Sequence, residues 1–325
     1  MLKKIGLGLT ILALCFALSG CDKQKEIKRS GFYLDTIFEV QIKVENKKEI
    51  IARETRNLNN ALDKLVELDA NINKLSPLSE ISALNSYAGV RMMELSKLTY
   101  DLLEKSLYAS AFTGGYFDIT WVPLVRLFET AHPSAERIAR MQAAIGYANV
   151  SLDANLRRAR YLHSNTEVDF NLIKAGFAVD LLASYLKNTH SGQIKAGDVA
   201  YYYGPRRVVF KVTDKQNIVL KLNNSAVTAL DTRTSYYSKS AAWRPYLPVD
   251  FPSDEASAAI QQIIVAAPNA VTAEVLANAC YFMGVERSLN KISELKKQAS
   301  RQNVYEVYFV LADENGIRVV SSADK

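Results

Sequence analysis

Between two predicted helices the chain reads Gly115-Tyr116-Phe117-Asp118-Ile119-Thr120-Trp121-Val122-Pro123-Leu124. Ser96 is predicted to cap the first helix, which runs to about Phe112, because a serine hydroxyl accepts a backbone N–H of the first turn. Gly114-Gly115 is predicted to end that helix, and the second helix is predicted over residues 123–132. Asp118 lies between the two helices. It is either a helix cap or turn former or a site residue, and both roles stay open from the sequence.

Outward from this segment, the apolar pattern predicts an α+β fold. Apolar and polar residues alternate over residues 38–44, as in a half-buried strand. They recur at helical spacing over residues 48–69. Polar residues 76–85 and proline-containing residues 243–254 are predicted as loops. Further helices are predicted at 134–144, 173–186 and 271–283, with a hairpin over 150–161 and strands at 200–203, 208–212, 218–222, 226–230, 263–266, 305–311 and 318–321. This order is typical of a single large domain with mixed or antiparallel sheets flanked by helices.

The N-terminus follows the pattern of a bacterial lipoprotein signal. Lys3 and Lys4 precede an apolar run, which ends in Leu18-Ser19-Gly20-Cys21. A charged tip, a short apolar core and a small-residue cleavage site form a secretory signal. An N-terminal membrane helix is the alternative, but a run of about 14 residues is shorter than the ~20 that span a bilayer. We predict a signal peptide over residues 1–20, a lipidated Cys21 with a tether over residues 21–30, and one domain over residues 31–325.

This signal predicts a protein that is lipid-anchored on the periplasmic side of a bacterial membrane. Asp22, next to the lipidated cysteine, slightly favours the inner membrane by analogy with enteric-type bacteria. The formal net charge is +6, or +4 without Lys3 and Lys4, and the basic residues are scattered. An exported protein without a clustered basic patch is not expected to bind nucleic acid.

The cysteines and histidines exclude several kinds of site. Cys15 leaves with the predicted signal and Cys21 is predicted to carry lipid, so Cys280 has no disulfide partner within the mature chain. Its apolar neighbours predict a buried, inert thiol. The three histidines have no second ligand at metal-binding spacing, so zinc or a Ser-His-Asp triad is poorly supported.

A series of short segments carries a family resemblance. They are Thr36, Ser79-Glu80-Ile81-Ser82-Ala83-Leu84-Asn85, residues 115–124, Leu152-Asp153, Asp169, Gly176-Phe177-Ala178-Val179-Asp180, Gly197-Asp198, Ala266-Ala267-Pro268, Ala273-Glu274 and Met283-Gly284. Together they resemble the ApbE family, the FAD:protein FMN transferases, over nearly the whole mature chain. The resemblance implies an often lipidated protein that binds FAD and splits its pyrophosphate with Mg²⁺. FMN is then passed to a Thr or Ser of an exported redox protein.

The resemblance also implies site positions. Those for FAD are Leu34 (a methionine in the family), Tyr116, Phe117, Asp118, Asp169 and Ala175. Ala175 stands where the family has a lysine, and the adjacent Lys174 is either its replacement or a solvated residue at a helix start. The metal positions are Leu172, Glu274 and Asn278. Glu274 and Asn278 are four residues apart on a predicted helix, so a shared magnesium ion and an i,i+4 hydrogen bond explain the pair equally well.

Other family motifs are altered. A Thr-Ser-Gly motif reads Ala229-Leu230-Asp231, a His-Ile-Ile-Asp-Pro segment is not found, and no histidine follows His190. In the family these positions touch phosphate, metal or the reacting group, and the sequence identifies no catalytic residue. Three functions therefore stay open. The first is an active transferase. The second is a non-catalytic relative that binds flavin or a protein partner and assists a membrane redox complex. The third is an unrelated lipoprotein scaffold.

Overall fold

The computed structural model describes residues 23–130, 133–233, 241–251, 259–299, 304–314 and 316–323. The predicted signal peptide and Cys21 lie outside these residues. Within them, no helix is both long enough and apolar enough to cross a membrane.

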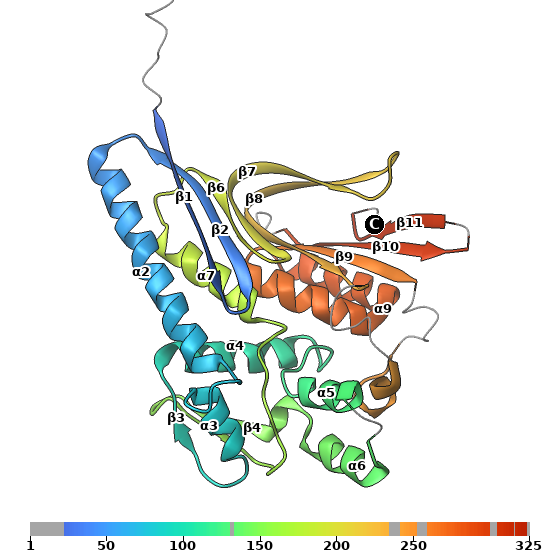
Figure 1. The fold of residues 1–325 in the computed structure, drawn as a ribbon. Coiled ribbons are helices and arrows are strands. Elements are labelled where there is room, and N and C mark those ends of the chain that lie inside the picture. Colours follow the sequence, from blue (N-terminus) through green and yellow to red (C-terminus); the bar gives the residue numbers. More distant parts are fainter. Residues whose placement is uncertain are drawn as a thin grey trace, which may run out of the picture.

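An eight-stranded sheet dominates the fold, and each pair of neighbouring strands is antiparallel (Figure 1). Its strands, in spatial order, are β1 (Gln24–Tyr33), β2 (Thr36–Glu45), β6 (Ser191–Ala196), β7 (Val199–Lys211), β8 (Asn217–Asp231), β9 (Ile260–Ala267), β10 (Glu306–Asp313) and β11 (Gly316–Ser321). Helices α2 (Lys48–Ile72), α7 (Lys174–Tyr185) and α9 (Ala270–Gln298) pack against it. The α+β prediction is confirmed.

A smaller layer of helices and short strands lies below the sheet in Figure 1. It contains α3 (Glu80–Ser86), α4 (Lys97–Phe112), α5 (Val122–Thr130), α6 (Ala135–Ala144), a three-stranded sheet of β3 (Met93–Glu94), β5 (Arg158–Tyr161) and β4 (Val150–Asp153), and the 3-10 helices η1 (Tyr147–Asn149) and η2 (Ala241–Tyr246). Ser96 caps α4 as predicted, because its side chain accepts the Thr99 N–H.

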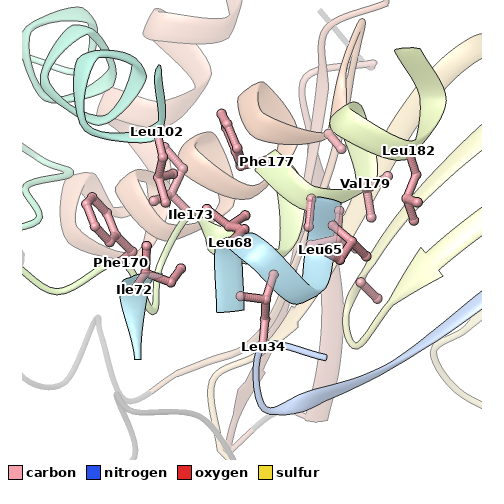
Figure 2. Packing of buried hydrophobic residues seen from close by; sticks show 14 of the residues in the cluster. Leu34, Leu65, Leu68, Ile72, Leu102, Phe170, Ile173, Phe177, Val179 and Leu182 are labelled. Carbon is pink, nitrogen blue, oxygen red and sulfur yellow. The ribbon is translucent and has the colours of Figure 1, made fainter. Parts of the chain in front are cut away.

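The main core forms where α2 and α7 meet beneath the sheet (Figure 2). Leu65 and Leu68 come from the apolar stripe of α2, and Phe177 and Val179 come from α7; all four are buried. Leu34, in the turn between β1 and β2, is buried in the same cluster. The core therefore fixes this turn relative to α2 and α7, which matters for the site below.

Two segments differ from the sequence prediction. Residues 24–30 were predicted as a tether but form most of β1, in which Ile27 is buried opposite Ile42. The predicted loop 76–85 contains α3, capped by Ser79, whose side chain accepts the Ser82 N–H. Both elements are polar with few buried residues, so hydrophobic periodicity does not reveal them.

The strands predicted at 200–230 and the helix predicted at 271–283 are longer than expected. The four short strands merge into β7 and β8, with an irregularity between Tyr202 and Pro205. Helix α9 breaks at Gly284, where φ is 72°, and then continues to Gln298. The Ser288 hydroxyl donates to the Gly284 carbonyl at 2.6 Å and holds the second part in line.

Candidate functional site

A cavity of about 340 Å³ opens at one end of the large sheet, between the strand ends and helices α7 and α9. The predicted positions Leu34, Leu172, Ala175, Glu274 and Asn278 all line it, together with Lys174. A smaller cavity of about 100 Å³ adjoins it and is lined by Asp169. Leu34, Asp35, Asn171 and Lys174 line both cavities. The structure therefore brings most of the predicted site residues together.

The turn between β1 and β2 closes one side of both cavities. Leu34 and Asp35 have φ values of 52° and 62°, a left-handed conformation that costs a non-glycine residue roughly 1–2 kcal/mol. Burial of the Leu34 side chain offsets this cost, and the Leu34 N–H donates to Asp69 Oδ2 at 3.1 Å. Asp35 Oδ2 lies 2.8 Å from Lys174 Nζ. The turn is thus held in place by α2 and by the first residue of α7.

Helices α7 and α9 meet closely at the cavity, because Gly176 of α7 has no side chain. The Gly176 N–H donates to Glu274 Oε2 at 2.6 Å. A Cβ on Gly176 would lie 2.6 Å from the Ala270 carbonyl oxygen, so only glycine fits. Asn278 Nδ2 donates to the carbonyl oxygens of Glu274 at 2.9 Å and Leu172 at 3.1 Å. A hydrogen bond at i,i+4 spacing, from the Asn278 side chain to the Glu274 carbonyl, is therefore present, and the second bond connects Asn278 to Leu172, so the three predicted metal positions are linked.

Glu274 holds its proton near neutral pH. Burial raises the pKa of its carboxyl to about 8, and the Gly176 N–H and the Lys174 ammonium offset this only in part. Asp198 lines the same cavity, and burial with the nearby Asp231 raises the pKa of Asp198. A cavity with two carboxyls of raised pKa is a common arrangement at sites that bind cations or move protons.

The raised pKa of Glu274 predicts that the stability of the protein depends on pH when EDTA removes divalent cations. Its folded pKa of about 8 lies above the ordinary glutamate value of 4.5, so folded protein keeps a proton that unfolded protein has lost. The free energy of unfolding should therefore fall from about pH 5 to pH 8, by up to about 1.4 kcal/mol per pH unit. Glu274→Gln has no proton to lose. In urea unfolding, we expect the stability of this variant relative to wild type to rise steadily with pH. If the free energies of unfolding of wild type and Glu274→Gln changed with pH in the same way, the raised pKa of Glu274 would be contradicted.

The metal positions fit a magnesium ion that is shared with a substrate. Glu274, Asn278 and the Leu172 carbonyl supply the oxygen atoms that Mg²⁺ prefers. Within the part of the chain that the structure describes, no three His, Cys, Asp or Glu residues are grouped to hold a metal ion. Mg²⁺ is commonly held by one or two carboxylates together with substrate phosphates. One carboxylate beside a cavity matches that mode of binding, and a cation there would favour ionised Glu274.

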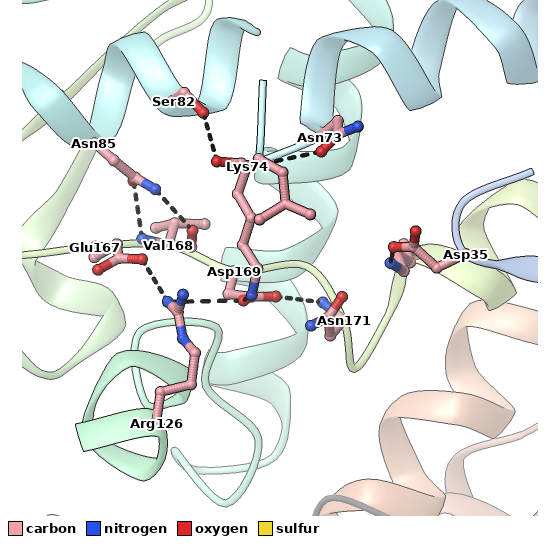
Figure 3. A network of polar contacts seen from close by, with 12 residues as sticks. Asp35, Asn73, Lys74, Ser82, Asn85, Arg126, Glu167, Val168, Asp169 and Asn171 are labelled. Carbon is pink, nitrogen blue, oxygen red and sulfur yellow. Dashed lines mark hydrogen bonds and ion pairs between the residues drawn. The ribbon is translucent and has the colours of Figure 1, made fainter. Parts of the chain in front are cut away.

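Asp169 is part of an ion-pair network (Figure 3). Its buried carboxylate accepts from Lys74 Nζ and from the Asn171 N–H at 2.9 Å, and Arg126 lies 3.8 Å away. Arg126 also pairs with Glu167. Asp169 and its ion-pair partner Lys74 both line the smaller cavity. No sequence motif indicated Lys74 or Arg126.

The aromatic segment lies apart from the two cavities. Phe117 is in the core, and Tyr116 is half-buried with its ring centroid 5.9 Å from the Arg287 guanidinium carbon. Asp118 Oδ1 accepts the N–H and hydroxyl of Thr120, and its Oδ2 accepts the Tyr147 N–H at 2.7 Å. These contacts match the turn-forming role. None of the three residues lines either cavity.

Asp198 is a site residue that sequence reasoning missed. It follows Gly197, whose φ of 54° turns the chain from β6 into β7 at the cavity wall. The Gly197-Asp198 pair was visible as a family segment, but only the structure shows that Asp198 lines the same cavity as Glu274. Cys280, by contrast, is the buried thiol that was predicted, and burial raises its pKa to about 12.

Proteins of known structure share this fold. A FAD:protein FMN transferase of Haemophilus influenzae is 23% identical over 349 aligned positions, covering 99% of this chain and 97% of that protein. The apo crystal structure of the Pseudomonas stutzeri flavinyl transferase ApbE has a TM-score of 0.74 at 20% identity, covering 92% of this chain and 95% of that one. The flavin transferase ApbE from Vibrio cholerae has a TM-score of 0.70 at 17% identity, covering 92% and 98%. Residues 34–301 match the model of the ApbE family, and the chain therefore belongs to that family.

Proposed function

We propose that this chain is an exported, lipid-anchored FAD:protein FMN transferase. The observation that carries the proposal is the meeting of Glu274, Asn278 and the Leu172 carbonyl in a cavity that also contains Lys174 and Asp198. These residues supply oxygen ligands for a divalent cation, a positive charge for a phosphate and a carboxyl for proton transfer. Relatives named FAD:protein FMN transferase support the same reaction.

In this proposal the pyrophosphate of FAD occupies the larger cavity, next to Lys174. Ala175 stands at the position of the family lysine and cannot bind phosphate. Lys174, one position earlier, takes over this role, because it lines both cavities. Magnesium at Glu274, Asn278 and Leu172 would neutralise charge on the reacting phosphoryl group. The smaller cavity, which Lys74 and Asp169 line, takes a polar part of the nucleotide.

The transfer step breaks one phosphoanhydride bond and forms one phosphoester bond. The hydroxyl oxygen of an acceptor Thr or Ser attacks the phosphorus of the FMN half, and AMP leaves with the bridging oxygen. The hydroxyl proton passes to Asp198. Among the carboxyls that line the cavity, Glu274 is assigned to the metal and Asp35 is paired with Lys174, so Asp198 is the one that remains for this role.

The anchor and the site are proposed to lie at opposite ends of β1. Only Asp22 and Lys23 separate Cys21 from the start of this strand at Gln24. A ten-residue strand is roughly 30 Å long. Lipid on Cys21 would thus hold the domain close to the membrane with its cavity turned away, facing proteins on the periplasmic side.

A non-catalytic flavin-binding protein is the second candidate. It is favoured by Ala175 at the family lysine position and by the lack of a histidine after His190. Adding Mg²⁺ and a threonine-containing acceptor peptide to the FAD-bound protein distinguishes the two functions. Release of AMP identifies a transferase, and intact FAD identifies a binding protein. A chain that does not bind FAD contradicts both.

Lys174 should control affinity for FAD. We expect Lys174→Gln to weaken binding about tenfold, because charge-assisted hydrogen bonds to phosphate contribute roughly 1.5–3 kcal/mol. Lys174→Arg keeps the positive charge, so its affinity for FAD should fall much less. Lys187→Gln, which removes an exposed lysine just beyond α7, serves as the control. Flavin fluorescence titration measures all three, and equal affinities for wild type and Lys174→Gln would contradict the assigned role.

A further inference from the structure

Four exposed apolar side chains either line the smaller cavity or are close in sequence to residues that line the two cavities. Phe32 and Ile37, which flank the Leu34-Asp35 turn, are 68% and 61% exposed. Leu75 is 86% exposed and lines the smaller cavity, and Leu78 in the same loop is 94% exposed. Clustered exposed apolar residues at a site indicate an interaction surface. We call these four residues the apolar rim.

Phe32 and Ile37 are neighbours on the exposed face of the sheet. They are directly opposite each other in the β1–β2 register. The next pair on this face is Ser30 and Glu39, so the apolar character is confined to the end of the hairpin. Side chains at this end contribute little to the core, and their exposure has no structural explanation within the described residues.

The backbone next to Phe32 is also available for pairing. β1 is the last strand in the order of the large sheet, so its outer edge carries no described strand. The Asn46 N–H donates to the Lys23 carbonyl at 2.9 Å, which fixes the hydrogen-bonded pairs at odd-numbered residues of β1. Because such pairs alternate with unbonded ones, Ser30 and Phe32 direct their N–H and C=O groups to the open edge.

Charge restricts pairing to the end of the strand near the cavity. Lys25, Lys28 and Arg29 lie along the first part of β1, and charged residues discourage pairing at a sheet edge. Residues 30–33, Ser-Gly-Phe-Tyr, carry no charge. An extended segment is therefore expected to add to the edge only beside the Leu34-Asp35 turn, from which it would lead to the cavity.

We propose that the apolar rim and the edge of residues 30–33 dock the acceptor segment of an exported protein, an extended stretch with apolar residues flanking its Thr or Ser. This inference rests on the proposed function, since a transferase must bring a protein hydroxyl to the cavity. Main-chain hydrogen bonds to β1 provide affinity and the rim selects apolar neighbours. A membrane is the less suitable occupant, because the start of β1, next to Cys21, is at the far end of the strand (Figure 1).

The test uses two fluorescein-labelled 12-residue peptides with a central threonine, flanked either by Val and Leu or by Ser and Gln. Fluorescence anisotropy measures their binding to the FAD-loaded protein. We expect wild type to bind the apolar peptide at least about tenfold more tightly than the polar one, since one buried apolar side chain is worth at least that factor. The double variant Phe32→Thr/Ile37→Thr has β-branched threonine at both strand positions. It should lose the preference for the apolar peptide. Leu75→Ser should reduce it.

Matched controls make each outcome decisive. Val209→Thr/Ile317→Thr changes two exposed apolar residues on other strands, 53% and 45% exposed, and should bind like wild type. No apolar preference in wild type, or a preference unchanged in Phe32→Thr/Ile37→Thr, overturns the docking site. If phospholipid vesicles compete with the apolar peptide for binding, the rim is a membrane-binding surface, and the proposed docking site is overturned as well. Magnesium-dependent AMP release at saturating acceptor peptide is measured in parallel in every variant, so loss of the proposed function is distinguished from loss of docking.

Discussion

Glu274→Gln is expected to lower magnesium-dependent release of AMP from FAD by at least about 100-fold, because a metal that offsets phosphoryl charge contributes several kcal/mol to the rate. The variant has nearly the same shape as wild type. Its side-chain carbonyl can still accept the Gly176 N–H, which in wild type donates to Glu274 Oε2 at 2.6 Å. Stability should therefore be retained while the negatively charged metal ligand is lost. Chromatography of AMP at saturating FAD, Mg²⁺ and threonine acceptor peptide measures the effect.

A control on the same helix separates this effect from a general change in charge. Glu294→Gln removes an exposed carboxylate of α9 and should leave AMP release within about twofold of wild type, as expected for surface changes far from a site. Full activity in Glu274→Gln would show that the metal, if needed, is held elsewhere. Restoration of activity by a higher Mg²⁺ concentration would support the assignment of Glu274 as a ligand.

Gly176→Ala is expected to lower the free energy of unfolding by about 3 kcal/mol, at the upper end of typical overpacking costs. The new Cβ would meet the Ala270 carbonyl oxygen at 2.6 Å and Glu274 Oε2 at 2.8 Å. Because Ala270 begins α9 and packs against α7, the clash can be relieved only by moving the two helices apart. That movement would also displace Glu274 from the cavity floor, so AMP release should fall with stability.

Gly31→Ala is the matched control for this substitution. Its Cβ would approach the Tyr33 ring at 2.5 Å, about as close as in Gly176→Ala. The neighbour is the outer part of a flexible side chain and can rotate, so the cost should stay below about 1 kcal/mol. Urea unfolding compares both variants with wild type. Equal losses would contradict the rigid α7–α9 contact on which the site depends.

Local patterns predicted the elements that present a buried face or a cap. The alternation over residues 38–44 corresponds to β2, and Ser96 caps α4. β1 was missed because it is an edge strand with a single buried residue, Ile27. The strands predicted separately at 200–203 and 208–212 form one strand, because the Gly204 N–H donates to Asn224 Oδ1 at 2.9 Å and the irregularity is accommodated within the paired strands β7 and β8.

The site could be predicted only in part, for a similar reason. The spacing of Glu274 and Asn278 on one helix face is visible in the sequence. Their position beside Lys174 and Asp198 is not, because it depends on the close approach of α7 and α9 at Gly176 and on the chain reversal at Gly197. The resemblance indicated Asp118 as well, yet its carboxylate is taken up by the turn to Thr120 and Tyr147.

Mass spectrometry of a transfer reaction tests the central claim most directly. The chain from Asp22 onward is mixed with FAD, Mg²⁺ and the threonine peptide with apolar flanks, and the peptide mass and AMP are followed together. A transferase acting at this cavity predicts an FMN adduct on the threonine and an equal amount of AMP, both absent in Glu274→Gln. FAD that stays bound and intact in wild type, with no adduct, would contradict catalysis and identify the chain as a flavin-binding relative.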